Sequence, residues 1–194
     1  MASDDKNVYA SVGDWVRKDS VSSKISPSIA DADFDPNKGG GLTALRLTDG
    51  AKVWFAPGHP CSPPRPGCSP AQPAAASSIS GVVFSGSIDG HIRAFSTEDG
   101  HLLWDFDTVH DYPTVNGVAA KGGSLNGAGP VIVDGMVYVN SGYTRFGMSG
   151  NVLLASPWME NRRLYGYCDC SCRGFALASD DQIMACGIRR TNTT

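Results

Sequence analysis

Residues 44–54 read ALRLTDGAKVW, and residues 94–104 read AFSTEDGHLLW. The two segments share Ala, Asp-Gly and Trp at matching places, so that Ala44, Gly50 and Trp54 correspond to Ala94, Gly100 and Trp104. Each segment is predicted to form a strand, a tight turn and a second strand, because Gly supplies the positive φ that such turns need. The small Ala lets a neighbouring strand approach closely, and the Trp offers a flat face for packing between sheets.

Further strand-like segments precede these repeats and recur along the chain. Short β-branched and aromatic runs occupy residues 8–11, 82–86 and 136–142. The latter two follow shorter apolar strands that end in Ser80-Gly81 and Asp134-Gly135. The unit is therefore four antiparallel strands with a period of roughly 40–50 residues, which is typical of a β-propeller blade.

The third copy of the repeat begins near Gly150 and stops after Ala155. The Asp-Gly turn and the Trp do not follow, and the composition becomes basic and rich in Cys. We therefore predict a propeller of residues 1–155 with about three blades. Residues 156–194 are predicted to be an irregular, non-homologous tail that arises from a shift of reading frame, a fusion junction or translated flanking DNA.

Five stretches give the sequence a more specific resemblance. They are residues 39–44, 66–72, 83–91, 114–117 and 138–143. In these stretches the chain resembles quinoproteins that depend on pyrroloquinoline quinone (PQQ), and most of all the polyvinyl-alcohol dehydrogenases. The resemblance implies an all-β, eight-bladed propeller that holds PQQ and Ca²⁺ on its axis, of which this chain would be an incomplete part. That branch also carries haem c, but the chain has no Cys-x-x-Cys-His attachment motif.

Long connections are predicted to gather on one rim of the propeller. In a four-stranded blade, the loops between the second and third strands and those between blades share one face, and here most of them are long. Such loops are where sites are usually built. The polar residues on this rim are His59, Arg65, Asp107, His110, Asp111, Asn116, Lys121, Asn126, Asn140, Tyr143 and Arg145.

The resemblance gives some of these rim residues a role. PQQ carries carboxylates that Arg side chains can bind, and a hard cation such as Ca²⁺ prefers carboxylate and amide oxygens. The predicted cofactor contacts are Asn116, Asn140, Arg65 and Arg145. The general base would be an Asp, which the sequence alone does not identify. The alternative for each residue is an ordinary solvated loop side chain.

The six Cys fall into two groups. Cys61 and Cys68 flank a Pro-rich loop and are predicted to form a disulfide if the protein lies in the periplasm. The tail holds Cys168, Cys170, Cys172 and Cys186. These thiols could bind Zn²⁺, but the spacing is poor for a structural zinc site, and an unselected tail is the favoured interpretation.

Charge and hydropathy narrow the range of partners. The formal net charge is -3, which gives no reason to expect nucleic acid. No apolar run approaches the roughly 20 residues of a membrane helix. The polar start lacks the features of a secretory signal, so the chain as written is expected in the cytoplasm, whereas the family resemblance implies the periplasm.

The predicted function is a fragment of a PQQ-dependent dehydrogenase that oxidises secondary alcohols, inactive by itself. Its partners would be a small or polymeric alcohol and an unidentified electron acceptor. The alternative is a non-catalytic propeller module that binds protein, because non-enzymatic propellers use the same repeat. Open blade edges are expected to favour self-association.

Overall fold

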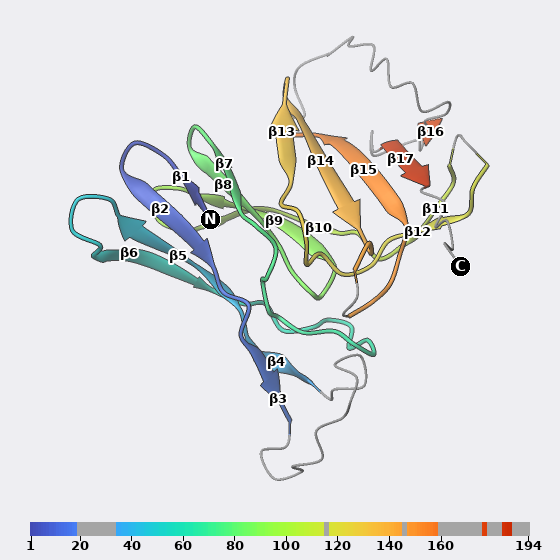
Figure 1. Cartoon of the computed structure of the whole chain (residues 1–194), viewed down its shortest axis with the longest axis horizontal. Helices are drawn as coiled ribbons and strands as arrows, with labels where there is room; N and C mark the ends of the chain where they lie inside the picture. Colours follow the sequence, from blue (N-terminus) through green and yellow to red (C-terminus); the bar gives the residue numbers. More distant parts are fainter. Residues whose placement is uncertain (19–33, 115–116, 145–146, 159–175, 178–183, 188–194) are drawn as a thin grey trace, which may run out of the picture.

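The computed structural model describes residues 1–18, 34–114, 117–144, 147–158, 176–177 and 184–187. Three antiparallel sheets of four or five strands stand side by side like blades (Figure 1). The described residues contain no helix, and therefore none that could cross a membrane. The all-β prediction and the prediction of three blades are confirmed.

Blade 1 has the strand order β1-β2-β5-β6. Its strands are β1 (Ala2–Ser3), β2 (Asn7–Ser11), β5 (Gly41–Arg46) and β6 (Lys52–Pro57). A separate hairpin, β3 (Trp15–Arg17) and β4 (Phe34–Gly39), projects from the connection between β2 and β5.

Blade 2 repeats this arrangement with the strand order β7-β8-β9-β10. Its strands are β7 (Ser77–Ile79), β8 (Val82–Gly86), β9 (His91–Ser96) and β10 (Leu102–Asp107). The turn glycines of the repeat, Gly50 and Gly100, have φ values of 70° and 74°, the left-handed conformation that their turns require. A two-stranded ribbon, β11 (Asp111–Tyr112) and β12 (Ala120–Lys121), lies in the connection to blade 3.

Blade 3 is completed by part of the C-terminal tail. Its strands are β13 (Val131–Val133), β14 (Met136–Ser141), β15 (Val152–Pro157), β17 (Met184–Gly187) and β16 (Ala176–Leu177) in that spatial order. Strand β17 pairs antiparallel with β15, at the place of a fourth blade strand. The domain boundary at residue 155 stays a prediction, because most of the tail lies outside the described residues.

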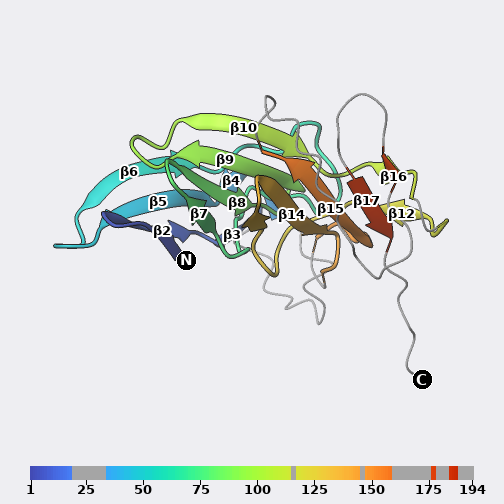
Figure 2. The ribbon, with the colours of Figure 1, turned by 90° about the horizontal axis from the view of Figure 1, so that it is seen from above.

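The short first strands lie at the centre of the arrangement, since β1 and β13 both contact β7. Ser78 donates to the carbonyl of Ser3 at 2.9 Å, and Ser77 donates to the carbonyl of Pro130. The outermost strands β6 and β10 lie away from this centre (Figure 2). The blades thus radiate from a common axis, as in a propeller.

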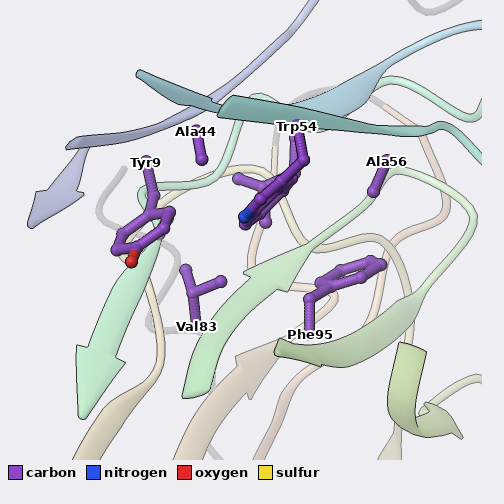
Figure 3. Close-up of a cluster of buried hydrophobic side chains, with 8 residues drawn as sticks. Tyr9, Ala44, Trp54, Ala56, Val83 and Phe95 are labelled. Carbon is purple, nitrogen blue, oxygen red and sulfur yellow. The ribbon is translucent and has the colours of Figure 1, made fainter. Parts of the chain in front are cut away.

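Apolar side chains fill the space between blades 1 and 2. Tyr9, Ala44 and Trp54 of blade 1 face Val83 and Phe95 of blade 2, and all are at least nine-tenths buried (Figure 3). Burying a large apolar side chain contributes about 1.5–3 kcal/mol, so this cluster dominates the contact between the two sheets. Trp54 also donates from Nε1 to the carbonyl of Thr97 at 3.0 Å.

A second cluster joins blades 2 and 3. Phe84 and Ala94 of blade 2 lie with Val137 and Val139 of blade 3 in one buried group. Trp158, just beyond β15, packs edge-on against Phe84 with ring centroids 4.7 Å apart. Each repeat therefore places its aromatic residue and its Ala at the contact with the following blade.

Candidate functional site

The connections between blades and those between second and third strands lie on the same rim, as the antiparallel order requires. Backbone hydrogen bonds link the connections of neighbouring blades, for example from Ile88 N to Ala71 O at 2.9 Å and from Ser124 N to Met148 O at 2.8 Å. The rim is therefore a continuous layer of loops held by the strands below it. The loops are the described parts of residues 12–40, 58–76, 87–90, 108–130 and 142–151.

Buried hydroxyl groups fasten this rim between blades 2 and 3. The Thr108 and Ser141 hydroxyl oxygens lie 2.6 Å apart, and both residues are fully buried. Thr108 also donates toward the carbonyl of Gly90, while the Gly123 N–H donates to the Ser141 hydroxyl at 2.8 Å. Because these bonds join the loops at residues 87–90 and 108–130 to the end of β14, they hold the rim rigid rather than leaving hydroxyl groups free for chemistry.

A disulfide closes the loop between blades 1 and 2. Cys61 and Cys68 are bonded, with Cα atoms 6.3 Å apart, and both are almost fully buried. The enclosed loop carries Arg65, which the bridge holds at the outer part of the rim.

Below this loop, blade 2 carries a buried arginine between two carboxylates. Arg93 Nη2 donates to Asp89 at 2.7 Å, and Arg93 Nε lies 3.2 Å from Asp105. The Arg93 and Asp89 side chains are only 4% and 3% exposed. Arg93 Nη1 has no hydrogen-bond partner among the described residues.

A hydrogen bond from a histidine and a further ion pair extend the arrangement outward. His91 Nδ1 lies 2.7 Å from Asp105, and Arg65 binds Asp107 through two hydrogen bonds of 2.6 and 3.2 Å. Asp107 also accepts from the Val109 N–H at 2.9 Å. We call Arg65, Asp89, His91, Arg93, Asp105 and Asp107 the charged cluster.

Partner groups control the charges in this cluster. Burial alone would raise the pKa of Asp107, but the hydrogen bonds from Arg65 and Val109 hold that pKa below its usual value. His91 and Arg93 act in the same way on the pKa of Asp105. Both carboxylates are therefore ionised at neutral pH and already hydrogen-bonded to Arg or His side chains, which makes them weak general bases.

His59 lies close to the charged cluster and behaves differently. Burial lowers the pKa of His59, and the positive charge of Arg93 lowers it further. The imidazole is therefore neutral at neutral pH and can accept a hydrogen bond or a proton.

Two hollows open beside Arg65. One of about 440 Å³ is lined by Arg65, Val109, Lys121, Met148 and neighbouring loop residues. The other, of about 280 Å³, lies against Lys18, Phe34 and the Pro-rich loop. Arg65 and Lys121 give the larger hollow a positive lining that suits an anionic group.

The structure separates the residues predicted to contact the cofactor. Arg65 pairs with Asp107, the last residue of the outermost strand β10, so it lies at the periphery of the rim. Asn140 lies exposed on β14, opposite Leu153, and lines neither hollow. Asn116 and Arg145 lie outside the described residues. The assignment of all four to a cofactor stays a prediction.

Most of the charged cluster does not follow from reasoning about loops. His91 and Arg93 alternate on β9, and Asp105 and Asp107 alternate on the facing strand β10. The signal in the sequence is the pair His-x-Arg and Asp-x-Asp on either side of the predicted turn, because alternate residues share one face of a strand. A search confined to the loops misses it.

The sheet topology shows that this chain is an incomplete β-propeller with a rim of long loops. Its sequence is 43% identical over 169 residues to a polyvinylalcohol dehydrogenase from Pseudomonas sp. It is 39% identical over 168 residues to the polyvinylalcohol dehydrogenase of Sphingopyxis sp. (strain 113P3). These matches cover 80% and 79% of this chain but only 24% and 23% of the two relatives. The chain is thus related to about a quarter of these enzymes, and the predicted resemblance is confirmed.

Solved structures with similar folds are more distant. The quinohemoprotein alcohol dehydrogenase of Pseudomonas putida HK5 matches 64% of this chain and 17% of its own, with 24% identity and a TM-score of 0.43. A europium-containing methanol dehydrogenase matches 61% of this chain and 19% of its own, with 22% identity and a TM-score of 0.38. No known protein-family model matches the sequence.

Proposed function

We propose that this chain is a propeller segment of a PQQ-dependent dehydrogenase that oxidises secondary alcohols such as those of polyvinyl alcohol. The observation that supports this proposal is the 43% identity to an enzyme named for that substrate. In such an enzyme PQQ would accept the hydride of the alcohol. The family resemblance favours the periplasm, where a disulfide such as Cys61–Cys68 is stable.

The described residues offer no cluster of carboxylates for a Ca²⁺ ion. They contain no group of three His, Cys, Asp or Glu side chains that could hold a metal. Each carboxylate of the charged cluster already faces an Arg or a His. We therefore propose that the metal ligands and the general base lie elsewhere in a longer enzyme, and that this chain alone does not turn over alcohol.

The described residues fit an anionic group better than a metal. Arg65 and Lys121 line one hollow, and Arg65 is held in place by Asp107 and by the disulfide loop. We propose that this positive lining binds a carboxylate at the periphery of the rim, apart from the axial position that the family resemblance implies for the cofactor, with PQQ as the first carboxylate to test.

Titration calorimetry of the purified chain with PQQ, together with a dye-reduction assay on polyvinyl alcohol, tests both parts of the proposal. We expect measurable PQQ binding, no turnover, and an affinity reduced about tenfold or more in Arg65→Gln, because a charge-assisted pair is lost. Arg46→Gln is the matched control, since Arg46 pairs with Asp49 at the tight turn away from the rim. Turnover by the chain would contradict the proposed dependence on other segments. Equal PQQ affinity in Arg65→Gln would contradict the role of Arg65.

A further inference from the structure

The Asp107 carboxylate lies between Arg65 and His91. Its Oδ2 accepts from Arg65 Nη2 at 2.6 Å, and its Oδ1 accepts from Arg65 Nη1 at 3.2 Å. His91 Nε2 lies 3.9 Å from the same Oδ1 atom. The longer of the two hydrogen bonds from Arg65 is therefore made to the oxygen that faces the imidazole.

The contact with Asp105 fixes which nitrogen of His91 can take up a proton. His91 Nδ1 lies 2.7 Å from Asp105. An ionised carboxylate only accepts hydrogen bonds, so Nδ1 carries the hydrogen of the neutral imidazole. Protonation therefore adds a hydrogen to Nε2, the atom that faces Asp107. A protonated His91 thus presents a new charged donor to the carboxylate that holds Arg65.

We propose that Asp107 restrains Arg65, and that His91, acting through Asp107, makes carboxylate binding in the larger hollow stronger at lower pH. A guanidinium has five N–H donors, of which Asp107 occupies two while it neutralises the charge. When protonated His91 shares that carboxylate, Arg65 has more positive charge left for a ligand in the hollow that it lines. His91 and Asp107 are thus positioning residues. This inference rests on the proposed carboxylate site and adds a pH dependence to it.

The charged and titratable groups around His91 come from its own strand, from the facing strand and from the neighbouring loops. They are Arg93 on β9, Asp105 and Asp107 on β10, Asp89 in the loop before β9, and Arg65 and His59 in the loop between blades 1 and 2. Histidine is the residue type whose charge commonly changes between about pH 5 and 8. His59 is therefore the competing group that an experiment has to separate from His91.

NMR of the free protein tests the coupling without any ligand. The side-chain N–H signals of Arg65, assigned by their absence in Arg65→Gln, should shift between pH 7 and pH 5 together with the imidazole signals of His91. The shift should vanish in His91→Gln. It should persist in His59→Gln and in the control His101→Gln, which lies at the tight turn of blade 2. Arg65 signals that do not respond to the His91 titration, or that follow His59 instead, would overturn the proposal.

Titration calorimetry with PQQ connects this coupling to binding. From pH 7 to pH 5 we expect PQQ affinity to rise about fivefold more in the wild type than in His91→Gln. The ionisation of PQQ itself affects both proteins equally. Equal pH dependence of the two proteins would contradict the role of His91.

A double-mutant cycle tests whether His91 acts through Asp107. Asp107→Asn keeps an oxygen for the Val109 N–H but removes the negative charge that His91 and Arg65 share. In this background, His91→Gln should have no further effect on PQQ affinity. An undiminished effect would show that the imidazole acts directly on the ligand, and the positioning role would be wrong. Absence of PQQ binding in every variant would contradict the proposed carboxylate site, while the Arg65 signals of the free protein would still decide the coupling.

Discussion

Gly50 and Gly100 occupy equivalent turns of the repeat but have different surroundings. Their φ values are 70° and 74°, so replacement by Ala imposes the same backbone cost, about 1–2 kcal/mol, at both positions. A Cβ on Gly50 would meet no atom within 4 Å. A Cβ on Gly100 would lie 2.6 Å from Cε3 and 2.8 Å from Cδ2 of the Trp54 ring.

We therefore expect Gly100→Ala to destabilise the protein more than Gly50→Ala does. Overpacking of this kind costs about 1–3 kcal/mol, which adds to the shared backbone cost. The free energy of unfolding, measured in urea by far-UV circular dichroism, should show this difference between the two variants. Gly50→Ala serves as the matched control for backbone strain.

A double-mutant cycle with Trp54→Leu tests the cause of that difference. Once the ring is removed, Gly100→Ala should cost no more than Gly50→Ala, because the excess arises from the contact between the added methyl group and Trp54. Equal costs of the two Ala substitutions in the wild-type background would refute the argument that the Trp of one blade packs on the turn of the next.

Three further predictions concern the disulfide, the buried arginine and the histidine beside it. Replacing both Cys61 and Cys68 with Ser should lower the free energy of unfolding by about 2–3 kcal/mol, from the entropy of the short loop; urea unfolding of the oxidised and the Ser-substituted chain measures this. Arg93→Met should lower the free energy of unfolding by about 3–5 kcal/mol, because it leaves the Asp89 carboxylate buried without its cation. Adding Asp89→Asn to Arg93→Met should recover part of that loss in urea unfolding, and no recovery would show that the pairing argument is wrong. The pKa of His59 in the folded protein lies below its usual 6.5, so the neutral imidazole contributes fully to the free energy of unfolding above pH 6.5. That contribution is lost as the pH falls from 6.5 through the folded pKa. The free energy of unfolding of His59→Gln should therefore vary less between pH 7 and pH 5 than that of the wild type.

Local patterns in the sequence were sufficient for the blades themselves. The spacing of Ala, Asp-Gly and Trp predicts two hairpins, and the structure shows them as β5–β6 and β9–β10. These features depend on neighbouring residues, on turn conformation and on the alternation of strands, all of which a sequence displays directly.

The candidate site depends on residues that the sequence holds apart. Arg65 meets Asp107 across 42 positions, and no local pattern joins them. The fourth strand of blade 3 could not be predicted from the sequence either, because Met184–Gly187 lacks the side-chain pattern of the repeat but still pairs with β15. Strand pairing uses backbone groups that every residue except Pro carries, so a segment without the expected side chains can occupy that place.

The sequence alone determined that the chain forms propeller blades, where their tight turns lie and to which enzymes it is related. Only the tertiary structure decided what each Trp packs against and which carboxylates are already paired with an Arg or a His. The reason is physical. Turns and strand alternation are local properties of the backbone, whereas burial and ion pairing depend on which segments the closed arrangement of sheets brings together.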